Sequence, residues 1–509
     1  MSGVVNYLKQ NLLAVGLAVV SALLSVVANR SGVGWSWDTS DYVAVGKNFA
    51  NGNGLLDATG IPMTVRPPGL SILIGVGDLL GLSVDITAQL LNATCAAIVV
   101  VATNQLLRVA QTKTSTRTIA TAFVAFSPAL LWQYSMIWSE PPFIALVVLA
   151  MIISLKPSDT RKFTLLVVLF IALFFVRYVG PVFALAIAVA SAFFDRRQLG
   201  LFKSALTNSL ALAISGLPVW LWLQRNKNID GTLTGARAPG GGSLLDPLKT
   251  FTATTGSWLT GSPVEGGIYL SWNDYPQSTK ILGVLFVLTI VVLFAVYIAR
   301  QFSQRSDSAQ SSVLVLSASI SVIYIAFSAY RFVHFELGPL DNRMMIPIFV
   351  PLVMMVAITI ERVSFNAKWL QQSLTTLFAV FVTFQAVSSI DDALRFGKDG
   401  RYWAAQAFQD QPIHQFVKSL PESSSLMSNQ AQQLFAVWQR SSVFNHYHLD
   451  LAQKADCDHR YYVWYNSTYL DGTPNLEGQP EGATEIYTDA SGLVLDLGPC
   501  SLDVATFWP

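Results

Sequence analysis

Two carboxylates stand three positions apart in a long polar stretch near the start of the chain. Asp38 and Asp41 follow an apolar run at 8–28 and precede a second apolar run that begins at Leu70. Side chains three positions apart share one face of a helix, so one carboxylate can act as a base while the other orients an acceptor. The alternative is that they cap a helix beginning at Tyr42, because Asp is a favoured N-cap residue. We favour a chemical role for Asp38 and leave both alternatives open for Asp41.

An arginine follows in the same stretch. Arg66 opens the sequence RPPGL, in which two prolines make the backbone rigid and fix the approach of the side chain toward the membrane surface. A guanidinium fork suits a phosphate group. The alternative is an arginine whose apolar stem lies in lipid while its head reaches the headgroups. The sequence therefore predicts either phosphate binding or membrane anchoring at Arg66.

Two further charged residues lie at the ends of apolar runs. Glu140 stands in SEPPF, where it either complements a helix dipole as a first-turn acid or faces the same site as Asp38. Arg177 ends another run with no acid near it in the sequence. An arginine at that depth is costly unless it meets an anion or a cavity, which makes Arg177 a candidate for anion binding.

A later segment concentrates polar side chains before the sequence MMIPIFVP. Its charged or titratable members are Arg331, His334, Glu336, Asp341 and Arg343. The two arginines are candidates for binding a phosphate, and the other three are candidates for contacting the acceptor or substrate. Several arginines that converge opposite carboxylates would suit a lipid that bears a phosphate.

The composition indicates a membrane protein. The 509 residues are 52% hydrophobic and only 12% charged, whereas soluble domains carry roughly a quarter charged residues. The mean hydropathy is +0.47. The formal net charge of +1 at pH 7 argues against a nucleic-acid partner, which would require a basic surface.

Apolar runs near the ~20-residue length of a membrane span recur along the chain. Those long enough to be counted predict about eleven transmembrane helices, at 8–28, 88–107, 118–135, 140–155, 163–177, 179–194, 204–223, 281–299, 312–331, 344–361 and 371–390. The pair 163–177 and 179–194 is either one long helix or a hairpin broken near Gly180 and Pro181, and the flanking charges favour the hairpin. The shorter run at 70–82 predicts an interfacial or re-entrant helix.

Lys and Arg residues in short loops predict the orientation. With the N-terminus in the cytoplasm, every short basic loop falls on the inner side. The loops 30–87, 224–280 and 332–343 and the chain after 391 then lie outside the plasma membrane. Within the second of these loops, the sequence GARAPGGGS predicts either a flexible lid or a disordered segment.

The last part of the chain changes composition sharply. We expect a transmembrane domain at 1–391 and a small soluble α/β domain at 392–509, with a helix at 431–440 and strands at 460–465 and 493–497. Cys457 and Cys500 both fall in this outer domain. An oxidising compartment favours a disulfide between them.

The order of several short motifs resembles the GT-C superfamily of polytopic glycosyltransferases, which includes protein mannosyltransferases and lipid A aminoarabinose transferases. The motifs are an acid after the first span with a Tyr four positions on (Asp38 and Tyr42), then AVGKNFANGNGL, RPPGLSILIG, SEPPF, VRYVGP and DNRMMIPIFVP. The helix sequence SLMSNQAQQLFAVWQR in the soluble tail is also similar. This similarity covers nearly the whole chain.

The resemblance implies an enzyme that moves a sugar from a polyprenyl-phosphate donor to an acceptor on the outer face, with inversion at the anomeric carbon. Asp38 would then be the base, Glu140 a second acid, and Arg66, Arg177 and Arg343 ligands of the lipid phosphate. Tyr42 would belong to the acceptor or substrate region. Many relatives carry Asp-Glu at the first position, whereas Thr39 follows Asp38 here. This departure leaves open which aspartate is the base and whether a divalent cation takes part.

Two other functions fit part of this pattern. A transporter or flippase of lipid-linked saccharides would also use arginines for phosphate, and a non-catalytic relative would act in envelope assembly. Neither requires a carboxylate placed against the donor. The sequence contains no Walker loop, GxSxG or HExxH motif to support ATP-driven transport or hydrolysis. Many sugars fit the pattern, as do a glycan, a glycolipid and a protein acceptor.

Overall fold

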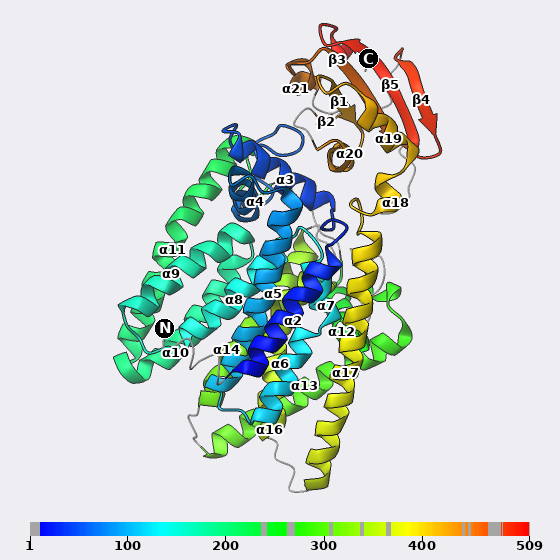
Figure 1. Ribbon diagram of the computed structural model, residues 1–509. Coiled ribbons are helices and arrows are strands. Elements are labelled where there is room, and N and C mark those ends of the chain that lie inside the picture. Colours follow the sequence, from blue (N-terminus) through cyan, green and yellow to red (C-terminus); the bar gives the residue numbers. More distant parts are fainter. Residues whose placement is uncertain are drawn as a thin grey trace.

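The chain folds into a bundle of helices that carries a small β-sheet domain at one end (Figure 1). The computed structural model describes residues 11–235, 242–261, 270–304, 309–335, 340–362, 368–439, 443–445, 449–466, 480 and 482–507. The segment GARAPGGGS, predicted to be a lid or disordered, lies largely outside these residues.

The bundle consists mainly of long helices. Its elements are α2 (Leu12–Ala28), α5 (Val84–Val109), α6 (Thr114–Ala125), α7 (Pro128–Tyr134), α8 (Glu140–Ser154), α9 (Thr160–Val176), α10 (Gly180–Leu199), α11 (Leu201–Asp230), α12 (Leu245–Thr260), η1 (Trp272–Asp274), α13 (Gln277–Gln304), α14 (Ala309–His334), α15 (Asn342–Met345), η2 (Ile346–Ile348), α16 (Phe349–Arg362) and α17 (Lys368–Asp399).

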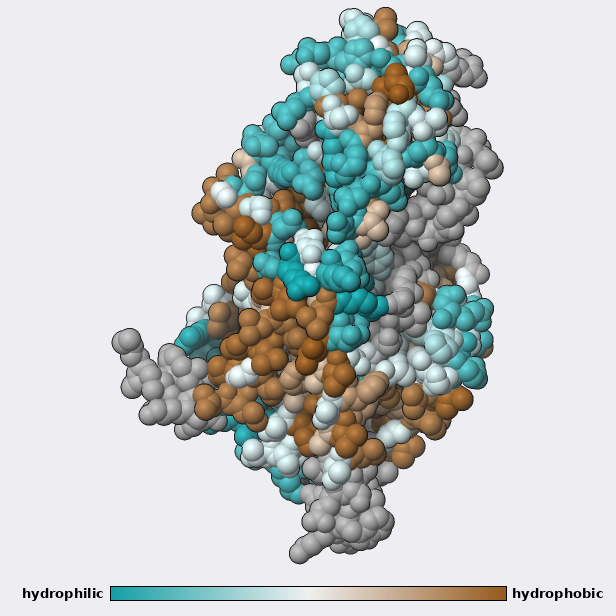
Figure 2. Space-filling model, turned by 45° about the vertical axis from the view of Figure 1, so that its right-hand side comes forward, coloured by the Kyte–Doolittle hydropathy of each residue, from teal (hydrophilic) through white to brown (hydrophobic). Residues whose placement is uncertain are grey.

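Every predicted span contains a helix, but the number of membrane crossings is not confirmed. Within the described part of the chain, five helices are both long and apolar enough to cross a membrane, at Val84–Val109, Leu201–Asp230, Ala309–His334, Asn342–Glu361 and Thr376–Asp399. Figure 2 shows hydrophobic side chains gathered over the bundle and hydrophilic side chains over the end with the sheet. This distribution is that of a membrane protein with a polar domain at one end.

The predicted hairpin between α9 and α10 is present. Arg177 leaves α9 in an extended conformation, and α10 begins at Gly180 with a proline in its first turn. A Cβ atom at Gly180 would lie 2.4 Å from the backbone of Leu173. Only a residue without a side chain allows the chain to turn so close to the preceding helix.

Two helices outside the bundle carry the polar stretch between the first two apolar runs. They are α3 (Trp37–Ala50) and α4 (Gly69–Leu79), and they pack against each other (Figure 1). Helix α3 begins at Trp37, and the Ser36 N–H donates a hydrogen bond to Thr39 Oγ1 (3.1 Å). The alternative in which the aspartates cap a helix starting at Tyr42 is therefore wrong. Asp38 and Asp41 lie within α3, three residues apart.

Glycines allow the close contact between α3 and α4. A Cβ atom at Gly75 would lie 2.6 Å from the carbonyl oxygen of Gly46 and 2.8 Å from Phe49 Cδ1. We expect Gly75→Ala to lower the free energy of unfolding by about 1–3 kcal/mol, because the extra methyl overpacks a tight contact. Gly16→Ala is the matched control, since Gly16 lies in α2 and a Cβ atom there would meet no neighbouring atom within 4 Å.

Thermal unfolding of both variants in detergent measures this difference. The control should be unchanged or up to about 1 kcal/mol more stable, because Ala is the better helix former. Equal stability of Gly75→Ala and the parent protein would contradict the close approach of α3 to α4.

The C-terminal domain, which we call the outer domain because the loop charges predict that it lies outside the membrane, is built around a mixed five-stranded sheet. Its strands are β1 (Ser425–Ser428), β2 (Val443–Asn445), β3 (His459–Tyr465), β4 (Thr484–Asp489) and β5 (Gly492–Pro499), in the order β2-β1-β3-β5-β4. The pairs β1–β2 and β1–β3 are parallel, and β5 pairs antiparallel with β3 and β4. The helical elements are α18 (Gln406–Gln409), α19 (Pro412–Ser419), α20 (Ala431–Trp438), α21 (Leu449–Gln453) and η3 (Val504–Phe507). The helix and two strands expected from the sequence correspond to α20, β3 and β5.

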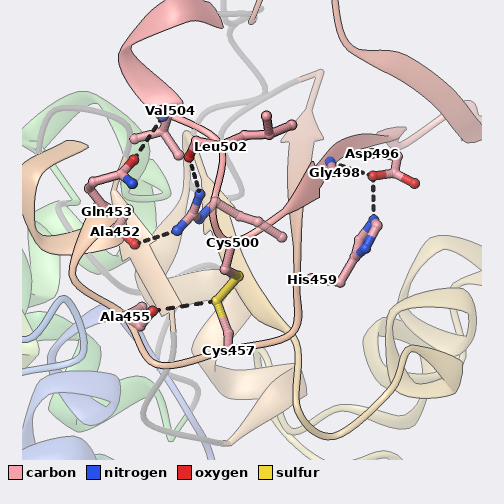
Figure 3. Close-up of a disulfide and its surroundings, with 11 residues drawn as sticks. Ala452, Gln453, Ala455, Cys457, His459, Asp496, Gly498, Cys500, Leu502 and Val504 are labelled. Carbon is pink, nitrogen blue, oxygen red and sulfur yellow. Dashed lines mark hydrogen bonds and ion pairs between the residues drawn. A yellow bond between two sulfur atoms is a disulfide. The ribbon is translucent and has the colours of Figure 1, made fainter.

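A disulfide closes one end of this sheet. It joins Cys457, just before β3, to Cys500, just after β5, with 5.9 Å between the Cα atoms (Figure 3). Close by, the guanidinium group of the buried Arg460 donates hydrogen bonds to the carbonyl oxygens of Ala452 (2.9 Å) and Leu502 (3.4 Å). The disulfide and these hydrogen bonds tie the strand ends to the neighbouring loops.

The outer domain rests directly on α3. Helix α17 continues past the expected boundary at 391 to Asp399 and leads into this domain (Figure 1). The hydroxyl of Ser40 donates to the carbonyl oxygen of Gln432 in α20 (2.6 Å), and the indole N–H of Trp35 donates to Ser40 Oγ (2.7 Å). Residues of the outer domain therefore help to hold the helix that carries Asp38 and Asp41.

Candidate active site

Asp38 lies between two arginines that are distant in the sequence. Its Oδ1 is 2.6 Å from Nη2 of Arg66, which precedes α4, and its Oδ2 pairs with Nη2 of Arg343 in α15. Arg343 follows Asp38 by 305 positions. A carboxylate that follows the first apolar helix thus shares a site with a guanidinium group from a much later segment.

The same two arginines extend the contacts to two further acids. Arg66 Nη1 pairs with Asp41 Oδ2, and Arg343 Nε lies 2.8 Å from Glu140 Oε1 at the start of α8. Glu140 also pairs with Arg177, at the end of α9. We call the six residues Asp41, Arg66, Asp38, Arg343, Glu140 and Arg177, joined in this order, the ion-pair network.

The network is largely shielded from solvent. The side chain of Glu140 is fully buried and that of Asp41 is 4% exposed, whereas Asp38 is the most exposed of the six at 22%. The Arg343 guanidinium lies 4.4 Å from the centre of the Trp138 ring, whose N–H donates to Ser36 Oγ (2.7 Å). Low exposure strengthens each ion pair and makes any uncompensated charge costly.

The two aspartates of α3 titrate differently because their partners differ. Burial would raise the pKa of Asp38, but the charges of Arg343 and Arg66 outweigh it and hold this pKa well below its usual range. Burial raises the pKa of Asp41 to about 7, against the effect of Arg66 and together with repulsion from Asp57 and Asp38. At neutral pH Asp38 is therefore ionised, whereas Asp41 is close to half protonated.

Among the residues that the structure describes, two carboxylate oxygens of the network find no hydrogen-bond partner. These buried atoms are Asp41 Oδ1 and Glu140 Oε2. Buried polar atoms in proteins are usually paired, so unpaired acceptors beside an ion-pair network indicate a place where a ligand can donate hydrogen bonds.

Six of the residues singled out in the sequence meet in the network, and others lie elsewhere. Tyr42 is buried next to it, where its hydroxyl donates to Ser139 Oγ (3.3 Å). Asp341 caps α15 by accepting a hydrogen bond from the Met344 N–H (3.1 Å), so it positions the helix turn that carries Arg343.

The end of α14 holds two of the other candidates. Arg331 packs over the ring of Phe335 at 4.2 Å, and His334 stacks on Tyr330. The expected place of Arg331 among the phosphate ligands therefore has no support from these contacts. Glu336 lies outside the described residues.

Several residues around the network had no distinctive sequence signal. Ser139 accepts hydrogen bonds from both Tyr42 and Arg177 (3.2 Å), and Trp138 supports Arg343. Ser139 is the first residue of the SEPPF motif and Trp138 stands directly before it, so this motif was the one sequence signal that pointed to them. The contact between Ser40 and Gln432 joins two domains and could not be read from either segment alone.

A divalent cation does not fit the site in this arrangement. Each of its three carboxylates is paired with at least one guanidinium group. Among the residues that the structure describes, no three His, Cys, Asp or Glu side chains are grouped in a way that could hold a metal ion.

Comparisons of the sequence and of the structure give different results. No protein-family model and no curated protein sequence matches the chain. The structure is similar to that of ArnT from Cupriavidus metallidurans in the apo state, with a TM-score of 0.61 and 12% identity, over 99% of this chain and 100% of that one. It is also similar to the same enzyme bound to undecaprenyl phosphate, with a TM-score of 0.59 and 12% identity, over 96% and 98% of the two chains.

The agreement extends over nearly the whole of both chains, so it includes the helical bundle and the outer domain. ArnT is a GT-C glycosyltransferase. The resemblance inferred from the order of the motifs is thereby confirmed at the level of architecture, and this polytopic chain has the GT-C fold.

Proposed function

We propose that the protein is a glycosyltransferase that takes a sugar from a polyprenyl-phosphate donor and transfers it to an acceptor on the outer face of the membrane. The observation that supports this most is the position of Asp38 between Arg66 and Arg343. A base and two anion-binding groups are the parts that transfer from a phosphate leaving group requires.

The arginines would bind the phosphate of the donor. Guanidinium groups form paired hydrogen bonds with phosphate oxygens, and Arg66, Arg343 and Arg177 are already held close together by carboxylates. The solved complex of ArnT with undecaprenyl phosphate, which has the same fold, supports a lipid phosphate as the ligand. In the donor complex the phosphate would take over part of the pairing that the carboxylates supply now.

Asp38 would act as the general base. When the phosphate engages Arg66 and Arg343, Asp38 becomes available to accept the proton of the acceptor hydroxyl. The acceptor oxygen then forms a bond to the anomeric carbon while the bond from that carbon to the phosphate oxygen breaks. Attack opposite the leaving group inverts the anomeric carbon, and the arginines stabilise the charge that develops on the phosphate.

The proposed orientation follows from this chemistry and from the loop charges. The N-terminus would lie in the cytoplasm, about eleven helices would cross the plasma membrane, and the network would face outward beneath the domain at 392–509. The acceptor, whether a glycan, a glycolipid or a protein, would reach the network from the outer side of the membrane, with Tyr42 and Ser139 near the reacting groups.

The direct test is a transfer assay with the purified full-length protein in detergent. It is supplied with a panel of polyprenyl-phosphate sugars and envelope glycolipids, and mass spectrometry detects any new glycoside. We expect one donor and acceptor pair to react. If donors bind but only lipid-linked sugar movement across liposome membranes is found, the protein is a flippase and the proposal is wrong.

A further inference from the structure

With all three of its carboxylates ionised, the ion-pair network is electrically balanced. Three carboxylates, on Asp38, Asp41 and Glu140, alternate with three guanidinium groups, and all six side chains are mostly shielded from water. A phosphodiester, the form of phosphate in a lipid-linked sugar donor, brings one further negative charge. Placing an uncompensated charge in such a site is costly, so another charge must change when the phosphate binds.

The three carboxylates differ in the number of arginines with which they pair. Asp38 is paired with two arginines, and Glu140 is also paired with two. Within the described part of the chain, Asp41 is paired only with Arg66, and its buried Oδ1 has no hydrogen-bond partner there. Asp41 is therefore the carboxylate whose ionised form the network stabilises least.

The other titratable groups around Asp41 do not stabilise its ionised form either. Asp38 lies on the same helix, and Asp57, in the loop between α3 and α4, adds a second negative charge. In α4 the titratable residue is Asp78, whose charge acts on Lys47, and the part of α20 that packs on α3 contains no titratable side chain. Burial, together with the charges of Asp57 and Asp38, raises the pKa of Asp41 to about 7, which is close to the pH at which the protein would work.

We propose that Asp41 takes up a proton from solvent when the donor phosphate binds, so that Arg66 is released to the phosphate while Asp38 stays ionised. One negative charge enters and one carboxylate is neutralised, which keeps the total charge of the site constant. A protonated Asp41 can also donate a hydrogen bond to a phosphate oxygen. This inference rests on the proposed function, because it takes a lipid phosphate as the ligand.

Uptake of a proton by Asp41 would make the affinity for the donor depend on pH. Below about pH 7, Asp41 is already protonated in the free protein, and binding should be nearly independent of pH. Above it, each unit of pH should weaken binding about tenfold, because one proton must be taken up with each ligand. Asp41→Asn is neutral at every pH and should remove this dependence.

Isothermal titration calorimetry measures the proton directly. The probe is farnesyl phosphate methyl ester, a phosphodiester whose single charge does not titrate near neutrality, added to the full-length protein in detergent. Titrations at pH 8 are repeated in buffers with different ionisation enthalpies, and the slope of observed heat against buffer enthalpy gives the number of protons taken up. We expect a slope close to one proton for the parent protein and close to zero for Asp41→Asn.

Two outcomes separate this proposal from the proposed function. Binding of the probe without proton uptake would overturn the role of Asp41 and leave a lipid-phosphate enzyme intact, whereas absence of binding at any pH would refute the lipid-phosphate ligand itself.

Asp57→Asn is the matched control, since Asp57 acts on Asp41 only through its charge. The Asp57→Asn variant should have a lower pKa at Asp41, so its affinity for the probe should begin to fall at a lower pH. Its proton uptake on binding the probe at pH 8 should be kept.

Discussion

Asp38→Asn is expected to lower the rate of sugar transfer by roughly 10²–10⁴-fold, the usual contribution of a positioned base. The amide has nearly the same shape as the carboxylate but cannot accept the proton of the acceptor hydroxyl. Donor binding should persist or become tighter, because Arg66 and Arg343 lose a competing anion. Turnover with saturating donor and acceptor, together with a separate measurement of lipid-phosphate binding, distinguishes these effects.

The control for this variant is Asp78→Asn. Asp78 lies on α4 next to the same polar stretch but is not part of the ion-pair network, so its variant should transfer sugar at the parental rate. Normal turnover of Asp38→Asn would exclude Asp38 as the base. If Asp41→Asn alone lost activity, the base would be the other aspartate of α3.

Arg343→Met is expected to abolish transfer and also to destabilise the fold. Arg343 is the only member of the network that joins Asp38 to the fully buried Glu140. Removing one partner of a buried ion pair commonly costs 3–5 kcal/mol, and we expect about 3 kcal/mol because both carboxylates keep another arginine. Denaturant titration in detergent gives the stability, and the transfer assay gives the activity.

A double variant separates these two roles of Arg343. Adding Glu140→Gln to Arg343→Met makes the network neutral again, so most of the lost stability should return while transfer stays absent. Recovery of transfer in the double variant would contradict a role of Arg343 in binding the donor phosphate. Equal stability of the single variant and the parent protein would contradict the buried ion pairs.

Local features of the site could be predicted from the sequence alone. The spacing of Asp38 and Asp41 implied one helical face, and Gly180 followed by Pro181 implied the break between α9 and α10. The scarcity of charge across the apolar runs made each remaining acid or arginine at their ends a candidate for function, because lipid does not tolerate such groups without a partner. The charged residues of the network were singled out in the sequence for this reason.

Hydropathy and short spacings depend only on neighbours along the chain, so the sequence was sufficient to predict a membrane protein, the approximate positions of its apolar helices and the charged residues at their ends. The tertiary structure alone decided which charges meet. Arg343 and Arg331 looked alike in the sequence, yet only Arg343 pairs with Asp38 and Glu140, from which it is separated by 305 and 203 positions. Partners so far apart are selected by the packing of α3, α8, α9 and α15 together, and no local pattern records that packing.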